Sequence, residues 1–116
     1  MKSTIRKSLS AVTGDQLLQL LTALDNPHRL RILAALHGQG RNYISQLARD
    51  LGISRPLLHL HLQKLEEAGL VRSARELSDD GKALNYFELV DFSLLLNPHM
   101  IAEAAQSLSA STTKSD

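Results

Sequence analysis

The chain has 116 residues, a formal net charge of +1 and no cysteine. This length suits a single domain, and the missing cysteine excludes disulfides, thiolate metal sites and cysteine nucleophiles. Aromatic residues make up only 3% of the chain, so we expect a core of Leu, Ile, Val and Ala in packed amphipathic helices. No apolar run is long enough to span a bilayer or to form a secretory signal, and we therefore expect a cytoplasmic protein.

Positive charge is concentrated in one part of the sequence. Between Pro27 and Lys64 the only acidic residue is Asp50. The bases in this stretch are Arg29, Arg31, Arg41, Arg49, Arg55 and Lys64. Acidic residues gather further along, at Glu66, Glu67, Glu76, Asp79 and Asp80. We expect one electropositive region, although the net charge alone does not indicate a nucleic-acid partner.

The chain begins with a basic segment, residues 1–12, whose weak periodicity indicates a flexible arm. Thr13 and Gln16 then form a capping-box pattern in front of an apolar stretch, which predicts a first helix over residues 14–24. Its apolar face is expected to consist of Leu17, Leu20, Leu21 and Leu24.

A second helix is predicted to start at Asn26-Pro27, because Asn caps a helix and proline fits its first turn. It is expected to run to about His37 and to stop at the glycines that follow. We expect its inward face to consist of Leu30, Leu33, Ala34 and His37.

A short strand at Tyr43–Ile44 is followed by residues 45–51, which have the apolar spacing of a short third helix. Gly52 ends this helix, and Ile53 is expected to be buried in the turn. Another helix begins directly after the turn, and this succession predicts a helix-turn-helix.

The fourth helix is predicted over residues 55–68, with Ser54 as its cap and proline in its first turn. We expect Gly69 to end it in the left-handed conformation. The predicted buried stripe consists of Leu58, Leu62 and Leu65.

Apolar and polar residues alternate over residues 70–77 and 83–90, with turn-forming residues at 78–82 between them. This pattern predicts a β-hairpin directly after the fourth helix, in the position of a wing. We expect residues 91–96 to form a turn.

A last helix is predicted from Asn97-Pro98 to about Leu108, and the polar tail 109–116 is expected to be disordered. The predicted fold is mainly α with a small β-hairpin (α+β). It is a winged helix-turn-helix domain over residues 13–108, with about five helices and a wing of two or three strands.

Three segments carry a family resemblance: Leu24–Leu33 (LDNPHRLRIL), Ile44–Ala48 (ISQLA), and Ser54–Pro56 (SRP) with residues 61–71. They resemble the second helix, the third helix, and the recognition helix with the start of the wing in the ArsR/SmtB family of prokaryotic repressors. The resemblance covers about residues 14–105. It implies a homodimeric transcriptional regulator, most simply a repressor, that places its fourth helix in the major groove of a palindromic DNA operator.

One departure from the family concerns sensing. Many members sense thiophilic metals through cysteine on the third helix, which this chain lacks. Others use Asp and His ligands on the last helix, but Asp91, His99 and Glu103 do not reproduce that spacing. His99 and Glu103 could share a zinc ion or form a solvated pair on the helix exterior. We predict no metal site and no cofactor, and the effector stays open.

A helix in the major groove reads base edges with the outward side chains of its N-terminal half. Arg55 is the first candidate, because it can donate two hydrogen bonds to guanine or anchor a phosphate. Leu57 and Leu60 could touch thymine methyl groups or pack into the hairpin. His61 matches a family position that points inward, so we expect it to be partly buried and hydrogen-bonded. The candidate base-reading residues are Ser54, Arg55, Leu57, His59, Leu60 and Gln63.

Other polar residues are candidates for contacts with the DNA backbone. In the hairpin, Arg75 and Lys82 could reach the DNA, whereas Asp79 and Asp80 at the turn would repel it. The residues placed to bind phosphates beside the groove are Arg41, Ser45, Gln46 and Lys64.

The first and last helices carry more apolar side chains than so small a domain can cover, which favours packing against a second copy of the chain. Alternatively, these helices complete the core of a monomer. Two copies would supply the two reading units that a palindromic site needs. The candidate dimerisation residues are Leu17, Leu20, Leu21, Leu24, Met100, Ile101, Ala104, Ala105 and Leu108.

We do not expect an enzyme, because the sequence has no Gly-rich phosphate loop, no nucleophile motif and no converging pair of acids. The stronger alternative is a winged helix used for protein–protein contact in a transcription or chromatin assembly. The low net charge and the apolar Leu57 and Leu60 would permit it. The fold alone does not decide between the two functions.

Overall fold

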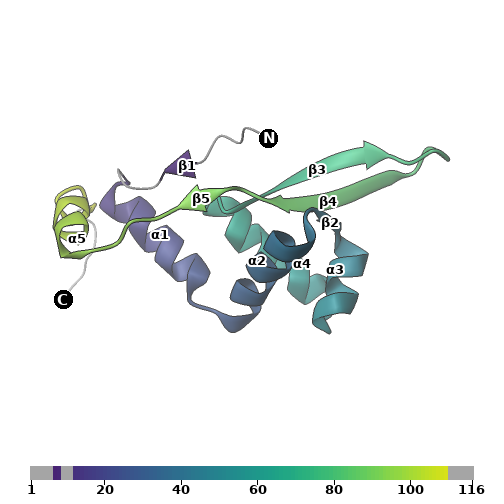
Figure 1. Cartoon of the computed structure of the whole chain (residues 1–116), viewed down its shortest axis with the longest axis horizontal. Helices are drawn as coiled ribbons and strands as arrows, with labels where there is room; N and C mark the ends of the chain where they lie inside the picture. Colours follow the sequence, from purple (N-terminus) through teal and green to yellow (C-terminus); the bar gives the residue numbers. More distant parts are fainter. Residues whose placement is uncertain (1–6, 9–11, 110–116) are drawn as a thin grey trace. The chain divides into compact units, whose positions relative to one another are not determined.

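The computed structural model describes residues 7–8 and 12–109. These residues form two compact units: a central unit, Ala23–Val90, and a terminal unit, made of Met1–Thr22 and Asp91–Asp116. Within the described ranges there are five helices and short strands, so the predicted α+β fold class is confirmed (Figure 1). None of those helices has the length and apolar character needed to cross a membrane.

The central unit begins with α2 (Pro27–Gln39), which starts where the Asn-Pro pair predicted it. The side chain of Asn26 accepts hydrogen bonds from the backbone N–H groups of His28 and Arg29, at 2.9 and 3.2 Å. These bonds satisfy two of the amides that a helix start leaves without a partner. The helix ends two residues beyond the predicted His37, before Gly40, whose φ is +81°.

The predicted inward face of α2 is wrong for three of its four residues. Leu30 is 52% exposed, and Ala34 and His37 are exposed as well. The buried residues are Ile32, Leu33 and Leu36. Two stripes of α2 share Leu33, and the one that carries Ile32 and Leu36 buries more apolar surface than the one with alanine and histidine, so it faces the core.

The helix-turn-helix consists of α3 (Ile44–Leu51) and α4 (Arg55–Glu67). Gly52 ends α3, as predicted, and its φ of +68° lies in the left-handed region. The Ser54 side chain accepts a hydrogen bond from the Leu57 N–H at 3.2 Å, as expected of a cap. Ile53 is only half-buried in the turn, less than predicted. At the end of α4, Gly69 has the predicted left-handed φ of +79°.

The core of the central unit lies beneath α4. Leu58, Leu62 and Leu65 are fully buried, as predicted. Side chains from the other elements of this unit complete the core, and the largest fully buried ones among them are Ile32, Leu36, Leu47, Leu70 and Val71.

A three-stranded antiparallel sheet of order β2-β4-β3 completes the central unit. The hairpin strands β3 (Val71–Leu77) and β4 (Ala83–Leu89) pair with Leu77 opposite Ala83, so the predicted turn at residues 78–82 is confirmed. The third strand, β2 (Asn42–Tyr43), lies one residue earlier than predicted, because Ile44 is already the first, buried residue of α3. Figure 1 shows the far end of the hairpin projecting away from the helices of this unit.

The terminal unit contains most of α1 (Gly14–Leu24), which has the predicted bounds. The capping box is formed, since the Thr13 N–H donates to Gln16 Oε1 at 2.9 Å and the Gln16 N–H donates to Thr13 Oγ1 at 3.1 Å. A short parallel pair joins β1 (Lys7–Ser8) to β5 (Phe92–Ser93). β5 lies inside the segment predicted to be a turn.

The last helix, α5 (Pro98–Ala105), starts at its predicted cap, where the Asn97 side chain accepts from the Met100 N–H at 2.8 Å. It ends three residues before Leu108. Most of the predicted arm, residues 1–6 and 9–11, and the tail from residue 110 onward lie outside the described residues.

The start of α1 and the end of α5 are in close contact. The Gly14 N–H donates to Ser107 Oγ at 2.9 Å, and the Ser109 N–H donates to Asp15 Oδ1 at 3.1 Å. A Cβ atom at position 14 would collide with the carbonyl oxygen of Ala104 and with the Leu108 side chain. Glycine at this position therefore permits the close approach of the two helices.

Candidate nucleic-acid interface

One side of α4 is buried and the other faces outward. His61 lies with the buried leucines, and at 100° per residue Leu60 and Gln63 lie near the middle of the opposite side. We call this surface the outward α4 face. Its residues, all exposed and all predicted contact residues, are Arg55, Leu57, His59, Leu60, Gln63 and Lys64.

The polar side chains of the outward α4 face make no polar contacts with the rest of the described chain. Within the described residues, the side chains of Arg55, His59, Gln63 and Lys64 have no hydrogen-bond or ion-pair partner. No acidic residue lies between Arg55 and Lys64, and the acids of α4 come only at its C-terminal end. This face therefore presents hydrogen-bond donors and positive charge from Arg55 to Lys64, and Glu67 adds one carboxylate at its C-terminal end. Ser54, at the helix start, already uses its side-chain oxygen as a cap.

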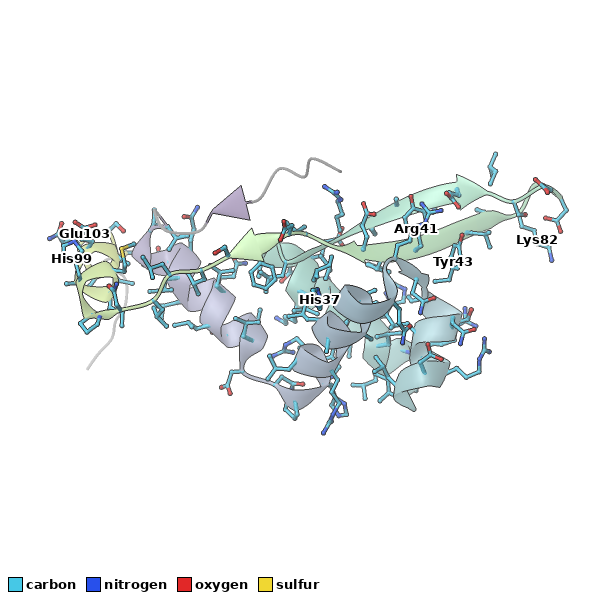
Figure 2. All side chains as sticks on the ribbon, in the orientation of Figure 1. His37, Arg41, Tyr43, Lys82, His99 and Glu103 are labelled. Carbon is cyan, nitrogen blue, oxygen red and sulfur yellow. The ribbon has the colours of Figure 1, made fainter. Side chains whose placement is uncertain are left out.

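Arg41, predicted to bind phosphate, is paired within the central unit. Its Nη2 donates to Glu76 Oε2 at 2.9 Å, and its guanidinium lies 4.0 Å from the centre of the Tyr86 ring. The Tyr43 hydroxyl donates to Glu76 Oε1 at 3.1 Å (Figure 2 labels Arg41 and Tyr43 beside the hairpin). Desolvation lowers the pKa of Arg41, but the hydrogen bond and charge of Glu76 outweigh it and the pKa is raised. A DNA phosphate would have to compete with Glu76 for this cation.

The two predicted phosphate contacts on α3 differ. Gln46 donates to Asp50 Oδ1 at 2.7 Å and accepts from Arg49 Nη2 at 2.8 Å, so its amide is held by its own helix. Ser45 is exposed, and its hydroxyl has no partner within the described residues. Of the two, only Ser45 can bind a phosphate without giving up an existing bond.

The wing carries paired arginines and an acidic tip. Arg72 donates to Glu88 Oε2 at 2.7 Å, and Arg75 donates to Asn85 Oδ1 at 3.3 Å. Lys82 lies at the far end of the hairpin (Figure 2), in the same turn as Asp79 and Asp80. Hydrogen bonds from the Ser78 hydroxyl and from the Lys82 backbone lower the pKa of Asp80, which keeps the carboxylate charged. The tip thus combines one cation with two acids.

His61 belongs to a buried cluster that sequence reasoning missed. It is 8% exposed, and its Nδ1 lies 3.1 Å from Nη1 of Arg29, whose Nε donates to the carbonyl oxygen of Ala23 at 2.6 Å. The ring of His28 lies 5.3 Å away, centre to centre. His61 points inward and is hydrogen-bonded at Nδ1, as expected, but its buried Nε2 has no hydrogen-bond partner within the described residues.

The environment of His61 favours its neutral form. Burial lowers the pKa of the imidazole, and the positive charges of Arg29 and His28 lower it further. The charge of Arg29, which the sequence suggested as part of an electropositive surface, is partly turned toward the interior. Only a contact between residues 32 positions apart reveals this, and sequence spacing carries no signal of it.

An apolar groove lies between α1 and α5 in the terminal unit. Of the predicted dimerisation residues, Leu17, Leu20 and Ala104 are buried in the single chain, and Leu24 and Met100 are half-buried. Leu21, Ile101, Ala105 and Leu108 are exposed. The residues that line the groove are Gly14, Leu17, Leu18, Leu21, Ile101, Ala104, Ala105 and Leu108. Leu18, which is 55% exposed, also lines the groove, but the apolar face predicted for α1 does not include it.

His99 and Glu103 lie side by side on α5, with His99 Nε2 3.4 Å from Glu103 Oε2 (Figure 2). Both side chains are well exposed. In residues 7–8 and 12–109 there is no group of three His, Cys, Asp or Glu side chains that could hold a metal ion.

Comparison with known sequences matches residues 24–74 to the family described as a helix-turn-helix domain. The chain is 38% identical over 79 residues to an HTH-type transcriptional regulator of Methanocaldococcus jannaschii. That match covers 68% of this chain and 81% of the relative.

Solved structures give the same fold. The solution structure of a homodimeric winged helix-turn-helix DNA-binding domain from Mycobacterium bovis, a possible ArsR-family transcriptional regulator, aligns with a TM-score of 0.58 and 26% identity. It covers 79% of this chain and 74% of that one. A crystal structure of an ArsR family transcriptional regulator aligns with a TM-score of 0.53 and 26% identity, over 64% of this chain and 75% of that one.

Proposed function

The chain belongs to the HTH-type transcriptional regulators, with the winged helix-turn-helix fold of ArsR-family members, and from this premise we propose that it binds specific double-stranded DNA as a homodimer. In this proposal α4 lies in the major groove, and two copies read the two halves of a palindromic operator. A protein bound over a promoter blocks the polymerase, so the simplest outcome is repression.

The observation that carries this proposal is the outward α4 face. Its donors have no partner among the described residues, and its two cations, Arg55 and Lys64, have no acid between them in the sequence, which complements the phosphates and base edges of DNA. Arg55, at the start of the helix, is placed to bind guanine or a phosphate, and His59 and Gln63 follow on the same face. Lys64, together with Ser45 on α3, would bind the backbone.

The other predicted contacts with the DNA backbone would require existing hydrogen bonds to rearrange or would contribute little to binding. Arg41 would exchange Glu76 for a phosphate, and Gln46 would leave Asp50. Arg75 and Lys82 would contact DNA only if the hairpin approached with its acidic tip turned away from the backbone. We therefore propose α4 as the principal contact and the wing as a secondary one.

The groove between α1 and α5 supports a homodimer. Its wall includes Leu18, Leu21 and Ile101, which are exposed in the single chain. Burying this apolar surface against the same surface of a second copy would be favourable, and a two-fold axis would pair the two grooves. The related M. bovis domain is homodimeric.

The proposal is tested by selecting bound duplexes from a random pool and measuring affinity for the selected site and for random DNA at two salt concentrations. Binding should weaken as salt rises. Arg55→Ala should weaken binding to the selected site by about 10- to 100-fold and weaken random binding less. Arg31→Ala is the control, because it removes an equal charge from an exposed, unpaired arginine on α2. Absence of DNA binding at both salt concentrations would instead favour a protein–protein interaction module.

A further inference from the structure

Two leucines are exposed in the middle of the outward α4 face. Leu60 is 61% exposed and Leu57 is 37% exposed, while Leu58 and Leu62 on the opposite side of the same helix are fully buried. The 61% exposure of Leu60 argues against the alternative that this residue packs into the hairpin. The free protein therefore keeps apolar surface in water at the position where we propose DNA contacts.

The two leucines form one small apolar strip. They are three residues apart on α4, so their side chains are neighbours on the helix surface. At 100° per residue, Arg55 and His59 lie on one flank of the strip, and Lys64 continues the line of the leucines toward the end of the helix. Within the described part of the chain these polar side chains have no partner. An occupant of this surface must therefore combine an apolar group with negative charge and hydrogen-bond acceptors close by.

Charge complementarity favours DNA as that occupant. An apolar segment of a partner protein would fit the leucines but would leave the unpaired Arg55 and Lys64 without counter-charges. DNA supplies phosphates for the cations and acceptors for the polar groups. The apolar group that base edges offer in the major groove is the 5-methyl group of thymine.

We infer that Leu57 and Leu60 contact thymine methyl groups in the major groove, so that the preferred half-site carries thymine beneath the middle of α4. The inference rests on the proposed function and adds one element of its sequence preference. Burying each methyl group against a leucine removes apolar surface from water on both sides, and only a T·A pair of the correct orientation offers that methyl group.

The test replaces thymine by uracil, one position at a time, in the selected site. Uracil lacks only the methyl group and keeps the hydrogen-bonding edge. At the contacted positions the affinity should fall about fourfold for each lost methyl group. Losing the same methyl in both halves of a palindromic site should multiply these effects, giving a loss on the order of tenfold. Replacement at thymines outside the α4 contact should leave the affinity unchanged.

Leu60→Ala and Leu57→Ala identify the protein partner. Each variant should bind the thymine site more weakly than the parent does and should lose sensitivity to uracil at the position that its leucine contacts. Gln63→Ala is the matched control on the same face: it should keep the full uracil effect. Thermal unfolding of each variant checks that the fold is retained, since both leucines are exposed.

The outcomes separate the two proposals. If no specific site emerges from the selection, the proposed function fails, and the thymine inference fails with it. If a specific site emerges but uracil has no effect at any position, only the thymine inference is overturned. It is also overturned if the leucine variants keep the full uracil effect.

Discussion

The two units of the chain differ in how completely they cover their own apolar side chains. In the central unit the large apolar residues of the core, such as Ile32, Leu47 and Leu62, are fully buried. In the terminal unit Leu18 is 55% exposed, Ile101 48% and Leu108 44%. Burial of apolar surface is the main driving force of folding. The central unit has a finished core, although Leu30, Leu60 and Leu77 are exposed on its surface, and among the described residues none of the largest fully buried side chains lies in the terminal unit. In our proposal the first unit reads DNA and the second mediates self-association.

The largest effect expected from this comparison follows from a cavity in the finished core. Leu62→Ala removes a fully buried side chain and should lower the free energy of unfolding by about 3 kcal/mol. Leu18→Ala, which shortens an exposed side chain, should cost less than about 1 kcal/mol in the monomer. Urea unfolding at low protein concentration measures both. Equal losses of unfolding free energy in the two variants would mean that the cores of the two units are equally complete.

A charge placed in the groove tests whether the terminal unit forms the dimer interface. Leu18→Glu should raise the dimer dissociation constant on the order of a hundredfold, because each copy would bury an unpaired carboxylate in the interface. Sedimentation across a range of concentrations measures the change. Leu30→Glu on α2 is the matched control, since Leu30 is 52% exposed but belongs to the central unit. A parent chain that is monomeric at high micromolar concentration would remove the basis of the homodimer proposal.

Features that depend on neighbouring residues could be predicted from the sequence. The caps at Thr13, Asn26, Ser54 and Asn97 form as expected, because each involves hydrogen bonds that span only two or three positions. The buried stripe of α4 was also predicted, since its three leucines stand opposite a mostly polar side. These elements could be predicted because they depend on residues that are close in the sequence and not on tertiary contacts.

Features that depend on tertiary contacts could not be predicted. On α2 leucine occurs on both of the stripes that share Leu33, and packing buries the more apolar one, with Ile32 and Leu36. The sequence predicts that Arg41 binds phosphate, but Glu76, 35 positions away, pairs with it. The outward α4 face could be predicted because its residues all lie on one helix, whereas the partners of Arg41 lie on the hairpin, which the sequence does not align with the segment around Arg41.

The smallest of the three effects concerns the one polar side chain in the finished core, His61. Burial, with the charges of Arg29 and His28, lowers its pKa in the folded protein below the ordinary value of 6.5. As the pH falls through 6.5 the unfolded chain therefore takes up a proton before the folded chain does, and the folded state loses stability, whereas above 6.5 this contribution is fully present. Unfolding experiments from pH 8 to pH 5 should show this loss.

Two variants separate His61 from the other histidines in that titration. His61→Gln keeps an acceptor for Arg29 but cannot be protonated, so it should remove the part of the pH dependence that His61 causes. His59→Gln on the exposed side of the same helix should leave that part in place. Because the cluster lies within the central unit, the His61 contribution should be equal at low and high protein concentration. A contribution that grew with dimer formation would mean that the central core is finished only in the dimer, and the contrast between the two units would be lost.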